Sequence, residues 1–248
     1  MLNLDFEGSK NYDGSMILLS GGSGLLGSTL QKLDSSIVAP AQAEMDIRDV
    51  DAIRRAISAY RPDVFIHAAA FVSPPANEKE PMKALENNII GTCNVVLACQ
   101  PANVRLVYIS TDYVYKGDRG RYNEDDEILP QNKYTWSKLG GECAVHLYDN
   151  SLIIRTSFGP DVFQYDKAFI DQYTSRDGVS VIAPMILKLA QRTDVTGVVN
   201  VGTERKTVKD LAIKLGRKDV GDMRRAEAMN DGITDTSFDL KRLKKLMS

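Results

Sequence analysis

The chain has 248 residues, of which 43% are hydrophobic and 26% are charged, and its formal net charge is −2. This length fits one large domain, or one domain with a smaller lobe, and is long enough to bury a sizeable core. The near-neutral charge disfavours a nucleic-acid partner. The sequence has neither an apolar run of membrane-spanning length nor an N-terminal signal-peptide pattern, so we expect no membrane partner.

The cysteines and histidines indicate the compartment and argue against a metal site. Cys93, Cys99 and Cys143 form no C-x-x-C pair, and an odd number of cysteines is typical of a reducing compartment. We therefore expect a cytoplasmic protein. His67 and His146 have no ligand spacing to the cysteines, which predicts that no metal is bound.

A glycine-rich turn at residues 20–27 follows an apolar run, and a helical pattern of leucines follows the turn. Gly21, Gly24 and Gly27 recur every three residues. In such a turn one glycine allows the tight bend, another lets a pyrophosphate approach, and a third lets the helix pack close to the strand. The helix N-terminus then offers free N–H groups to the anion. The pattern predicts dinucleotide binding, and an ordinary strand–helix turn is the alternative.

The rest of the first part of the chain alternates between strand and helix patterns. Residues 1–15 are polar and predict an N-terminal extension. Later strands are expected at residues 37–39, 64–67, 104–110 and 152–155, and helices at 46–60, 82–99 and 134–148. This alternation predicts an α/β fold, a Rossmann-type doubly wound parallel sheet. Ligands of such sheets lie beyond the carboxyl ends of the strands.

The alternation weakens after residue 157. A helix at residues 179–189, a strand at 198–201 and a short helix at 208–215 are the clearest later elements. We therefore expect a Rossmann domain over residues 16–157. A small C-terminal substrate lobe over residues 158–248, partly interleaved with the sheet, is expected to form a cleft with it.

A tyrosine and a lysine on the helix at 134–148 are candidates for proton chemistry. Tyr134 and Lys138 are four residues apart and share a helix face. A nearby ammonium favours the phenolate, so we expect Lys138 to lower the pKa of Tyr134. The Y-x-x-x-K spacing occurs by chance in many helices. The glycine turn upstream and the hydroxyl cluster at residues 110–115 make it more specific.

Eight short motifs occur in an order that resembles the extended short-chain dehydrogenase/reductase superfamily, and within it the dTDP-4-dehydrorhamnose reductase branch. They cover residues 20–27, 44–47, 61–64, 67–70, 88–92, 110–115, 134–142 and 154–157. The resemblance is good over about residues 16–160 and loose over the remainder.

The resemblance implies roles for individual residues. NADPH or NADH would supply the hydride, while the protein would supply position and a proton. The catalytic residues would be Thr111, which would bond the reacting sugar oxygen, Tyr134, and Lys138, which would hold the nicotinamide ribose. The substrate would contact Asp112, Tyr113 and Phe158. The cofactor would contact Gly21, Ser23, Gly24, Leu25, Leu26, Gly27, Asp46, Ile47, Ala68, Ala69, Ala70, Asn88, Tyr134 and Lys138.

The chain departs from this branch at several places. Residues 38–42 hold neither an acid for a ribose 2′-hydroxyl nor an arginine for a 2′-phosphate, so the choice between NAD and NADP stays open. Phe158 stands where the branch commonly has Trp, which predicts a different sugar pocket. Thr29 stands where some bacterial members have a glutamate associated with a metal-linked dimer, so no magnesium is expected. The chain is also shorter than usual, and the loss falls in the lobe.

Three functions fit these observations. The first is an NAD(P)H-dependent reductase of a nucleotide-linked 4-keto-6-deoxy sugar. The second is a nucleotide-sugar epimerase or dehydratase; a dehydratase typically has two acids after its catalytic hydroxyl residue, and here Tyr113 follows Asp112. The third is a non-catalytic nucleotide-binding regulatory subunit, such as that of methionine adenosyltransferase, which also resembles this branch. Fold alone does not decide among them. The superfamily also implies a homodimer through the helix at 82–99.

Overall fold

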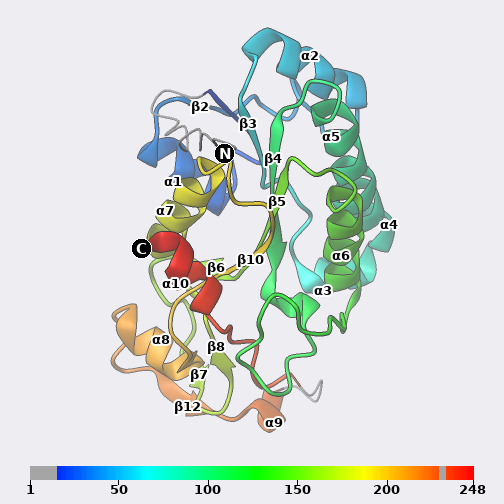
Figure 1. Ribbon diagram of the computed structural model, residues 1–248. Helices are drawn as coiled ribbons and strands as arrows, with labels where there is room; N and C mark the ends of the chain where they lie inside the picture. Colours follow the sequence, from blue (N-terminus) through cyan, green and yellow to red (C-terminus); the bar gives the residue numbers. More distant parts are fainter. Residues whose placement is uncertain (1–15, 229–232) are drawn as a thin grey trace, which may run out of the picture.

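The computed structural model of the protein describes residues 16–228 and 233–248 (Figure 1). The extension expected at residues 1–15 lies outside the described residues. Six parallel strands form the central sheet in the order β10-β5-β4-β3-β1-β2. They are β1 (Ile17–Ser20), β2 (Ile37–Val38), β3 (Val64–His67), β4 (Arg105–Thr111), β5 (Ser151–Thr156) and β10 (Gly197–Val201). The expected doubly wound sheet is confirmed, and its winding reverses between β1 and β3.

Helices cover both faces of the sheet because the strands are apolar on both sides. Ile17 and Leu19 of β1 point into one core and Leu18 into the other, as the two-residue repeat of a strand requires. The first core is closed by α1 (Leu25–Leu33), α7 (Val179–Ala190) and α10 (Lys241–Met247). The second is closed by α2 (Val50–Tyr60), α5 (Gly91–Cys99) and α6 (Lys133–Val145). Figure 1 shows the two groups of helices on opposite sides of the sheet.

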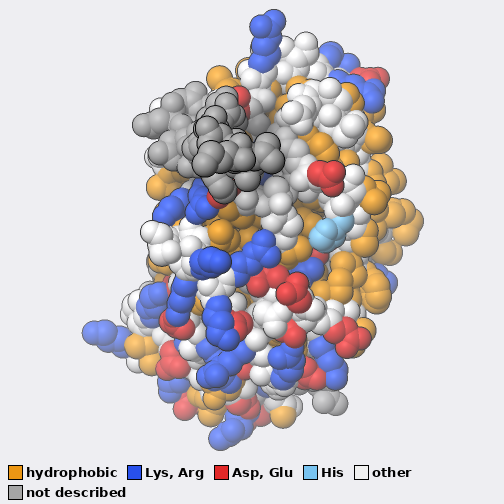
Figure 2. Space-filling model, in the orientation of Figure 1, with side chains coloured by type: hydrophobic (Ala, Val, Ile, Leu, Met, Phe, Trp, Pro, Cys, Tyr) orange, Lys and Arg blue, Asp and Glu red, His pale blue; other side chains and the backbone are white. Residues whose placement is uncertain are grey.

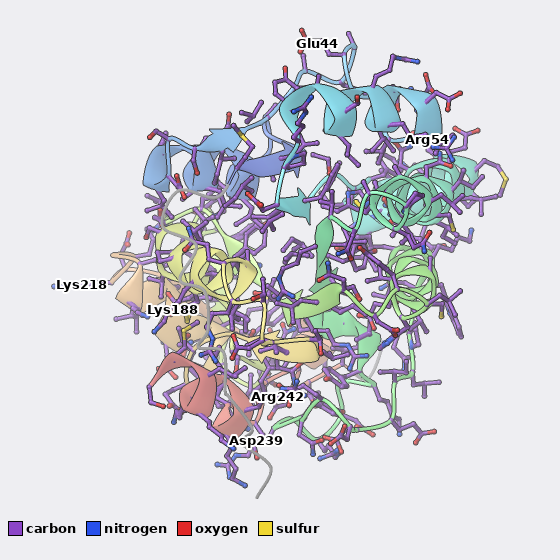
Figure 3. All side chains as sticks on the ribbon, turned by 45° about the horizontal axis from the view of Figure 1, so that its top comes forward. Glu44, Arg54, Lys188, Lys218, Asp239 and Arg242 are labelled. Carbon is purple, nitrogen blue, oxygen red and sulfur yellow. The ribbon has the colours of Figure 1, made fainter. Side chains whose placement is uncertain are left out.

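The C-terminal helix α10 docks beside α7 and β10. Lys188 of α7 and Arg242 of α10 lie on the same side of the molecule in Figure 3. The Lys188 ammonium donates to the Met247 carbonyl at 2.9 Å, and Arg242 donates to the Thr196 carbonyl at 3.0 Å. Leu243 of α10 is buried in the first core, so the basic residues of this helix form its solvated face.

Capping residues fix where the site helices begin. Asp49 caps α2 by accepting from the backbone N–H groups of Asp51 and Ala52. Asn132 and Thr135 form a capping box at the start of α6. The second cap sets Tyr134 in the first turn of α6.

The helix expected at residues 82–99 is interrupted. The proline-rich stretch before it forms α3 (Pro74–Lys79), which Ser73 caps and whose first residue is proline. Then come α4 (Pro81–Ala84), the π-helix η1 (Leu85–Ile90) and α5. Proline restarts the helix because its ring cannot continue the preceding one. π-Turns of this kind are frequent at functional sites.

The smaller lobe lies below the sheet in Figure 1. It contains β6 (Phe158–Gly159), β7 (Lys167–Phe169), β8 (Tyr173–Thr174), β9 (Asp177–Gly178), β11 (Lys206–Thr207), β12 (Gly221–Met223), α8 (Val208–Lys214) and α9 (Arg225–Ala228). The intervening α7 and β10 belong to the sheet layers, so the lobe is built from two separate stretches. No helix among the described residues has both the length and the apolarity needed to cross a membrane.

Candidate active site

A cleft of about 1310 Å³ lies at the carboxyl ends of the strands, where the sheet meets the lobe. The glycine-rich turn after β1 lines one end of the cleft. The other end is lined by residues of the lobe, among them Phe158 and Gly159 of β6, Arg176 before β9, and Arg225 of α9. This is the place where a doubly wound sheet binds its ligands. Of the expected site residues, those that line it are Gly21, Ser23, Gly24, Leu25, Leu26, Gly27, Ile47, Ala68, Ala69, Ala70, Thr111, Asp112, Tyr113, Tyr134, Lys138 and Phe158.

The three glycines of the turn have different surroundings. Gly21 has a φ of +83°, and a Cβ there would lie 2.6 Å from the Ala69 nitrogen. A Cβ on Gly27 would lie 2.2 Å from the Gly21 oxygen, so this glycine lets α1 pack against the turn. Gly24 has more space, with its nearest atom at 3.3 Å, and α1 starts there without a side-chain cap. The free N–H groups of α1 and the open face of Gly24 fit a pyrophosphate.

Two of the expected cofactor residues, Asp46 and Asn88, do not line the cleft. Asp46 pairs with Arg48 at 2.6 Å, and this hydrogen-bonded guanidinium lowers the pKa of Asp46 to about 2. Asn88 is 1% exposed. Its side chain accepts from the Phe71 nitrogen at 2.7 Å and donates to the Ser137 hydroxyl at 2.8 Å. Asn88 therefore ties η1 to α6 and to the strand end that lines the cleft.

Thr111, Tyr134 and Lys138 come together from two elements. Thr111 ends β4, and the other two occupy successive turns of α6. Tyr134 is half-buried, and Lys138 is 3% exposed. The Lys138 ammonium lies 4.0 Å from the centre of the Tyr108 ring. The predicted grouping of these three side chains in one cleft therefore matches their positions.

The protonation states differ from the sequence prediction. Burial raises the pKa of Tyr134 above its usual range, and the charge of Asp112 raises it further. Burial lowers the pKa of Lys138 to about 7. The expected lowering of the phenol pKa is therefore wrong, because the desolvation of Tyr134 is the largest effect and the charge of Asp112 acts in the same direction. At pH 7 the Tyr134 phenol keeps its proton and can donate it.

A buried ion pair connects β5 to α6, the helix that carries Tyr134 and Lys138. Arg155 of β5 donates to Glu142 of α6 at 2.8 Å, and these side chains are 4% and 1% exposed. The Ser110 hydroxyl donates to Glu142, and Arg155 also donates to the Tyr115 hydroxyl at 2.9 Å. The pair thus joins the end of β4 to α6 and β5. The sequence motifs included both charged residues but gave them no role.

The lobe end of the cleft combines expected and unexpected residues. Asp112, Tyr113 and Phe158 line it as expected, and Arg176 and Arg225 line it as well. Burial raises the pKa of Asp112 to about 6. The arginines come from the lobe, where the sequence pattern was weakest.

The buried histidine that ends β3 is a packing residue. His67 is 1% exposed, and its ring nitrogens lie 2.7 Å from the Ser20 hydroxyl and 3.1 Å from the Thr92 hydroxyl. Burial lowers the pKa of His67 to about 3, so it stays neutral. Within residues 16–228 and 233–248, no group of three or more histidine, cysteine or acidic side chains could hold a metal ion.

Comparisons with known proteins agree with this geometry. Residues 15–200 match the family described as RmlD substrate binding domain. A dTDP-4-dehydrorhamnose reductase from Streptomyces griseus is 35% identical over 148 residues, which are 57% of this chain and 49% of that protein. Methionine adenosyltransferase 2 subunit beta from Pongo abelii is 29% identical over 150 residues, 56% of this chain and 45% of that protein. The chain thus spans about half the length of these curated relatives.

A solved structure extends the similarity over nearly the whole chain. The dTDP-4-dehydrorhamnose reductase from Bacillus anthracis, crystallised in complex with NADP, superposes with a TM-score of 0.82. The sequences are 27% identical, and the match covers 93% of this chain and 91% of that one. The lobe is therefore included in the structural likeness. Together the matched family and the cleft show that the chain belongs to the RmlD substrate binding domain family, within the extended short-chain dehydrogenase/reductase superfamily.

Proposed function

We propose that the protein is an NAD(P)H-dependent reductase of a nucleotide-linked 4-keto-6-deoxy sugar. The observation that carries this proposal is the meeting of Thr111, Tyr134 and Lys138 in the cleft that also holds the glycine-rich turn. A ketone reductase needs a hydride for carbon and a proton for oxygen. The names of the reductase relatives support the substrate class.

The glycine end of the cleft would hold the dinucleotide. Gly21, Gly24 and the N-terminus of α1 would bind its pyrophosphate, and Ile47 would flank its adenine. When bound, the reduced nicotinamide supplies the hydride. The stretch from Ala39 to Gln42 lines the same end without an acid or an arginine, so we expect binding of both NADH and NADPH.

The protein's own part in the reaction is the proton. Tyr134 carries it at neutral pH because burial and Asp112 raise the pKa of the phenol. Tyr134 would donate this proton to the ketone oxygen, a step that typically contributes roughly 10²–10⁴-fold to the rate. Lys138 would hold the nicotinamide ribose, and its protonated form would stabilise the phenolate that results.

The lobe end would hold the sugar nucleotide. Tyr113 and Phe158 offer ring faces to the sugar, and Arg176 and Arg225 offer positive charge to the diphosphate. Arg225 is held in place by Asp171, which accepts from its backbone nitrogen at 2.9 Å. These contacts support a nucleotide-linked substrate over a free sugar.

The test is a substrate panel. The protein would be mixed with NADH or NADPH and with several nucleotide-linked 4-keto sugars made in situ, and nicotinamide oxidation would be followed by absorbance. We expect turnover of at least one of them, with a reduced sugar in the products. An epimerised ketone without net oxidation of the cofactor would contradict the proposal.

A regulatory subunit is the second candidate, because the Pongo abelii relative is named as a subunit of methionine adenosyltransferase. It would bind the same dinucleotide without turning over any sugar. A protein that binds NADPH, reduces no member of the panel and changes the rate of a methionine adenosyltransferase would establish this function. Turnover with a kcat that depends on Tyr134 would rule it out.

We also propose a homodimer through the face of α5 and α6. Figure 2 shows hydrophobic side chains gathered along the edge that these helices form. Leu97 and Trp136 of this face are 56% and 55% exposed. Leu97→Glu should give a monomer by light scattering, while Ile213→Glu, at a 42% exposed position on α8, should leave the dimer intact. A monomeric unmodified protein would contradict the proposal.

The cellular location belongs with these proposals. The cysteines Cys93, Cys99 and Cys143 are all free thiols. Free thiols support the cytoplasmic location predicted from the sequence. Fractionation of cells that produce the full chain tests it.

A further inference from the structure

Residues 233–240 form a segment, here named the C-terminal segment, that runs from the lobe back to the sheet. Its backbone N–H groups at Thr234 and Asp235 donate to the Gly117 carbonyl at 2.7 and 2.8 Å. The Ser237 carbonyl accepts from the Tyr122 nitrogen at 2.9 Å. The C-terminal segment is therefore fixed against the loop that follows β4, the strand that carries Thr111.

Thr236 of this segment contacts Asp112, a residue that lines the cleft. The Thr236 hydroxyl donates to one oxygen of Asp112 at 2.7 Å, and Thr236 is 2% exposed. The other oxygen of Asp112 accepts from the Thr111 hydroxyl at 3.2 Å. Asp112 is also 2% exposed, so water competes little for these bonds. Thr236, Asp112 and Thr111 therefore form a continuous series of buried hydrogen bonds that ends at Thr111 in the cleft.

These hydrogen bonds orient the Thr111 hydroxyl group. A threonine hydroxyl has one proton to donate, and the Thr111 hydroxyl donates it in a hydrogen bond to the Asp112 carboxylate. The charge of Asp112 also raises the pKa of Tyr134. In the resting site Tyr134 is thus the hydroxyl that keeps a free proton for the substrate. The Thr111 hydroxyl also lies within hydrogen-bond reach of Tyr134, where its hydrogen bond lowers the pKa of the phenol. It can therefore turn from Asp112 to the phenolate once Tyr134 has donated its proton.

We propose that Thr236 is a positioning residue of the reductase site, which anchors the Asp112 carboxylate so that it orients the Thr111 hydroxyl. Thr236 does not line the cleft, so it acts through Asp112 and does not touch the substrate. The proposal rests on the proposed reductase function. It adds a residue that lies 124 positions from its partner in the sequence.

The pKa of Asp112 depends on the titratable and charged groups that surround its carboxyl group. Thr111 and Tyr113 adjoin it on its own strand end, Tyr134 faces it from α6 and Arg176 faces it from the lobe. The hydrogen bonds from Thr236 and Thr111 and the charge of Arg176 lower the pKa of Asp112, while burial raises it. Removing the Thr236 hydroxyl should therefore raise that pKa.

The kinetic test compares Thr236→Val, which removes the hydroxyl at similar volume, with Thr236→Ser, which keeps it. We expect Thr236→Val to lower kcat about tenfold, as for the loss of one hydrogen bond to a charged group, and to move the acid limb of the pH profile to higher pH. Thr236→Ser should restore both, and the Kd for NADPH should stay unchanged in each. A Thr236→Val variant with wild-type kcat and acid limb, or a Thr236→Ser variant equally impaired, would overturn the proposal.

A second measurement needs no turnover and so separates this proposal from the proposed function. The Asp112 carboxyl would be titrated by carbon NMR in labelled protein, with Asp112→Asn assigning the signal. A higher Asp112 pKa in Thr236→Val but not in Thr236→Ser supports the contact even if no sugar is reduced. An unchanged pKa overturns it whatever the activity. If Thr236→Val fails to fold, Thr236→Ala replaces it.

Discussion

Glu142→Gln removes the negative half of the ion pair buried behind the active site. Arg155 donates to both carboxylate oxygens of Glu142, at 3.1, 3.2 and 2.8 Å from its two nitrogens. Removing one partner of such a pair typically costs 3–5 kcal/mol, because the other charge stays buried. The glutamine carbonyl keeps one acceptor and Tyr115 keeps another at 2.9 Å. We therefore expect a loss near the lower limit, about 3 kcal/mol.

Urea unfolding at pH 7 measures this loss, with Glu80→Gln as the matched control. Glu80 pairs with Lys83 on the surface at 2.5 Å, and these side chains are 48% and 56% exposed. Such exposed pairs contribute about 0–1 kcal/mol. A loss of unfolding free energy in Glu142→Gln no larger than in the control would refute the reasoning.

The same substitution has a signature in the active site. The charge of Glu142 raises the pKa of Lys138, against the larger lowering that burial causes. Removing this charge should move the Lys138 pKa below about 7. The limb of the pH profile that reports Lys138 should shift to lower pH. An unchanged or higher Lys138 pKa would contradict this reasoning.

Three further predictions concern the cofactor, the sugar and pH. Gly24→Asp places a carboxylate where the pyrophosphate is proposed to bind, so calorimetry with NADH and NADPH should show no binding; unchanged affinity would exclude this turn as the site. Phe158→Ala should raise KM for the sugar and leave the cofactor Kd unchanged; equal losses of both would place Phe158 elsewhere. Burial lowers the pKa of Lys138 to about 7, so the unfolded chain binds more protons above that pH and stability should rise with pH. Lys138→Met should therefore be stabilised relative to the unmodified protein more at pH 7 than at pH 9, and an equal difference at both would contradict the lowered pKa.

Local patterns made the fold and the cofactor end predictable. The glycine turn, the apolar strand runs and the spacing of Tyr134 and Lys138 each lie within one short stretch of sequence. Their meeting follows from topology, because parallel strands bring their carboxyl ends to one edge. The sequence therefore predicted the place of the cleft, and most of the residues that it predicted for the site line that cleft.

The remaining features depend on contacts between distant parts of the chain. Thr236 meets Asp112 across 124 positions, and no local pattern marks the Thr236 end of that contact. Arg176 and Arg225 come from short lobe elements without clear periodicity. The pKa of Tyr134 is raised, whereas the sequence predicted that it would be lowered. Helix spacing predicts how close Tyr134 and Lys138 lie, but it does not predict how deeply the two side chains are buried.

The proton donor is the central claim, and the kcat of Tyr134→Phe tests it most directly. The variant keeps the ring and removes the hydroxyl that the cleft presents beside Thr111. With NADPH and a nucleotide-linked 4-keto sugar that the unmodified protein reduces, kcat should fall by roughly 10²–10⁴-fold. The Kd for NADPH should stay within about twofold, since we expect the phenol hydroxyl to contribute less than ~0.5 kcal/mol to cofactor binding. A Tyr134→Phe variant that reduces the sugar as fast as the unmodified protein would contradict the account.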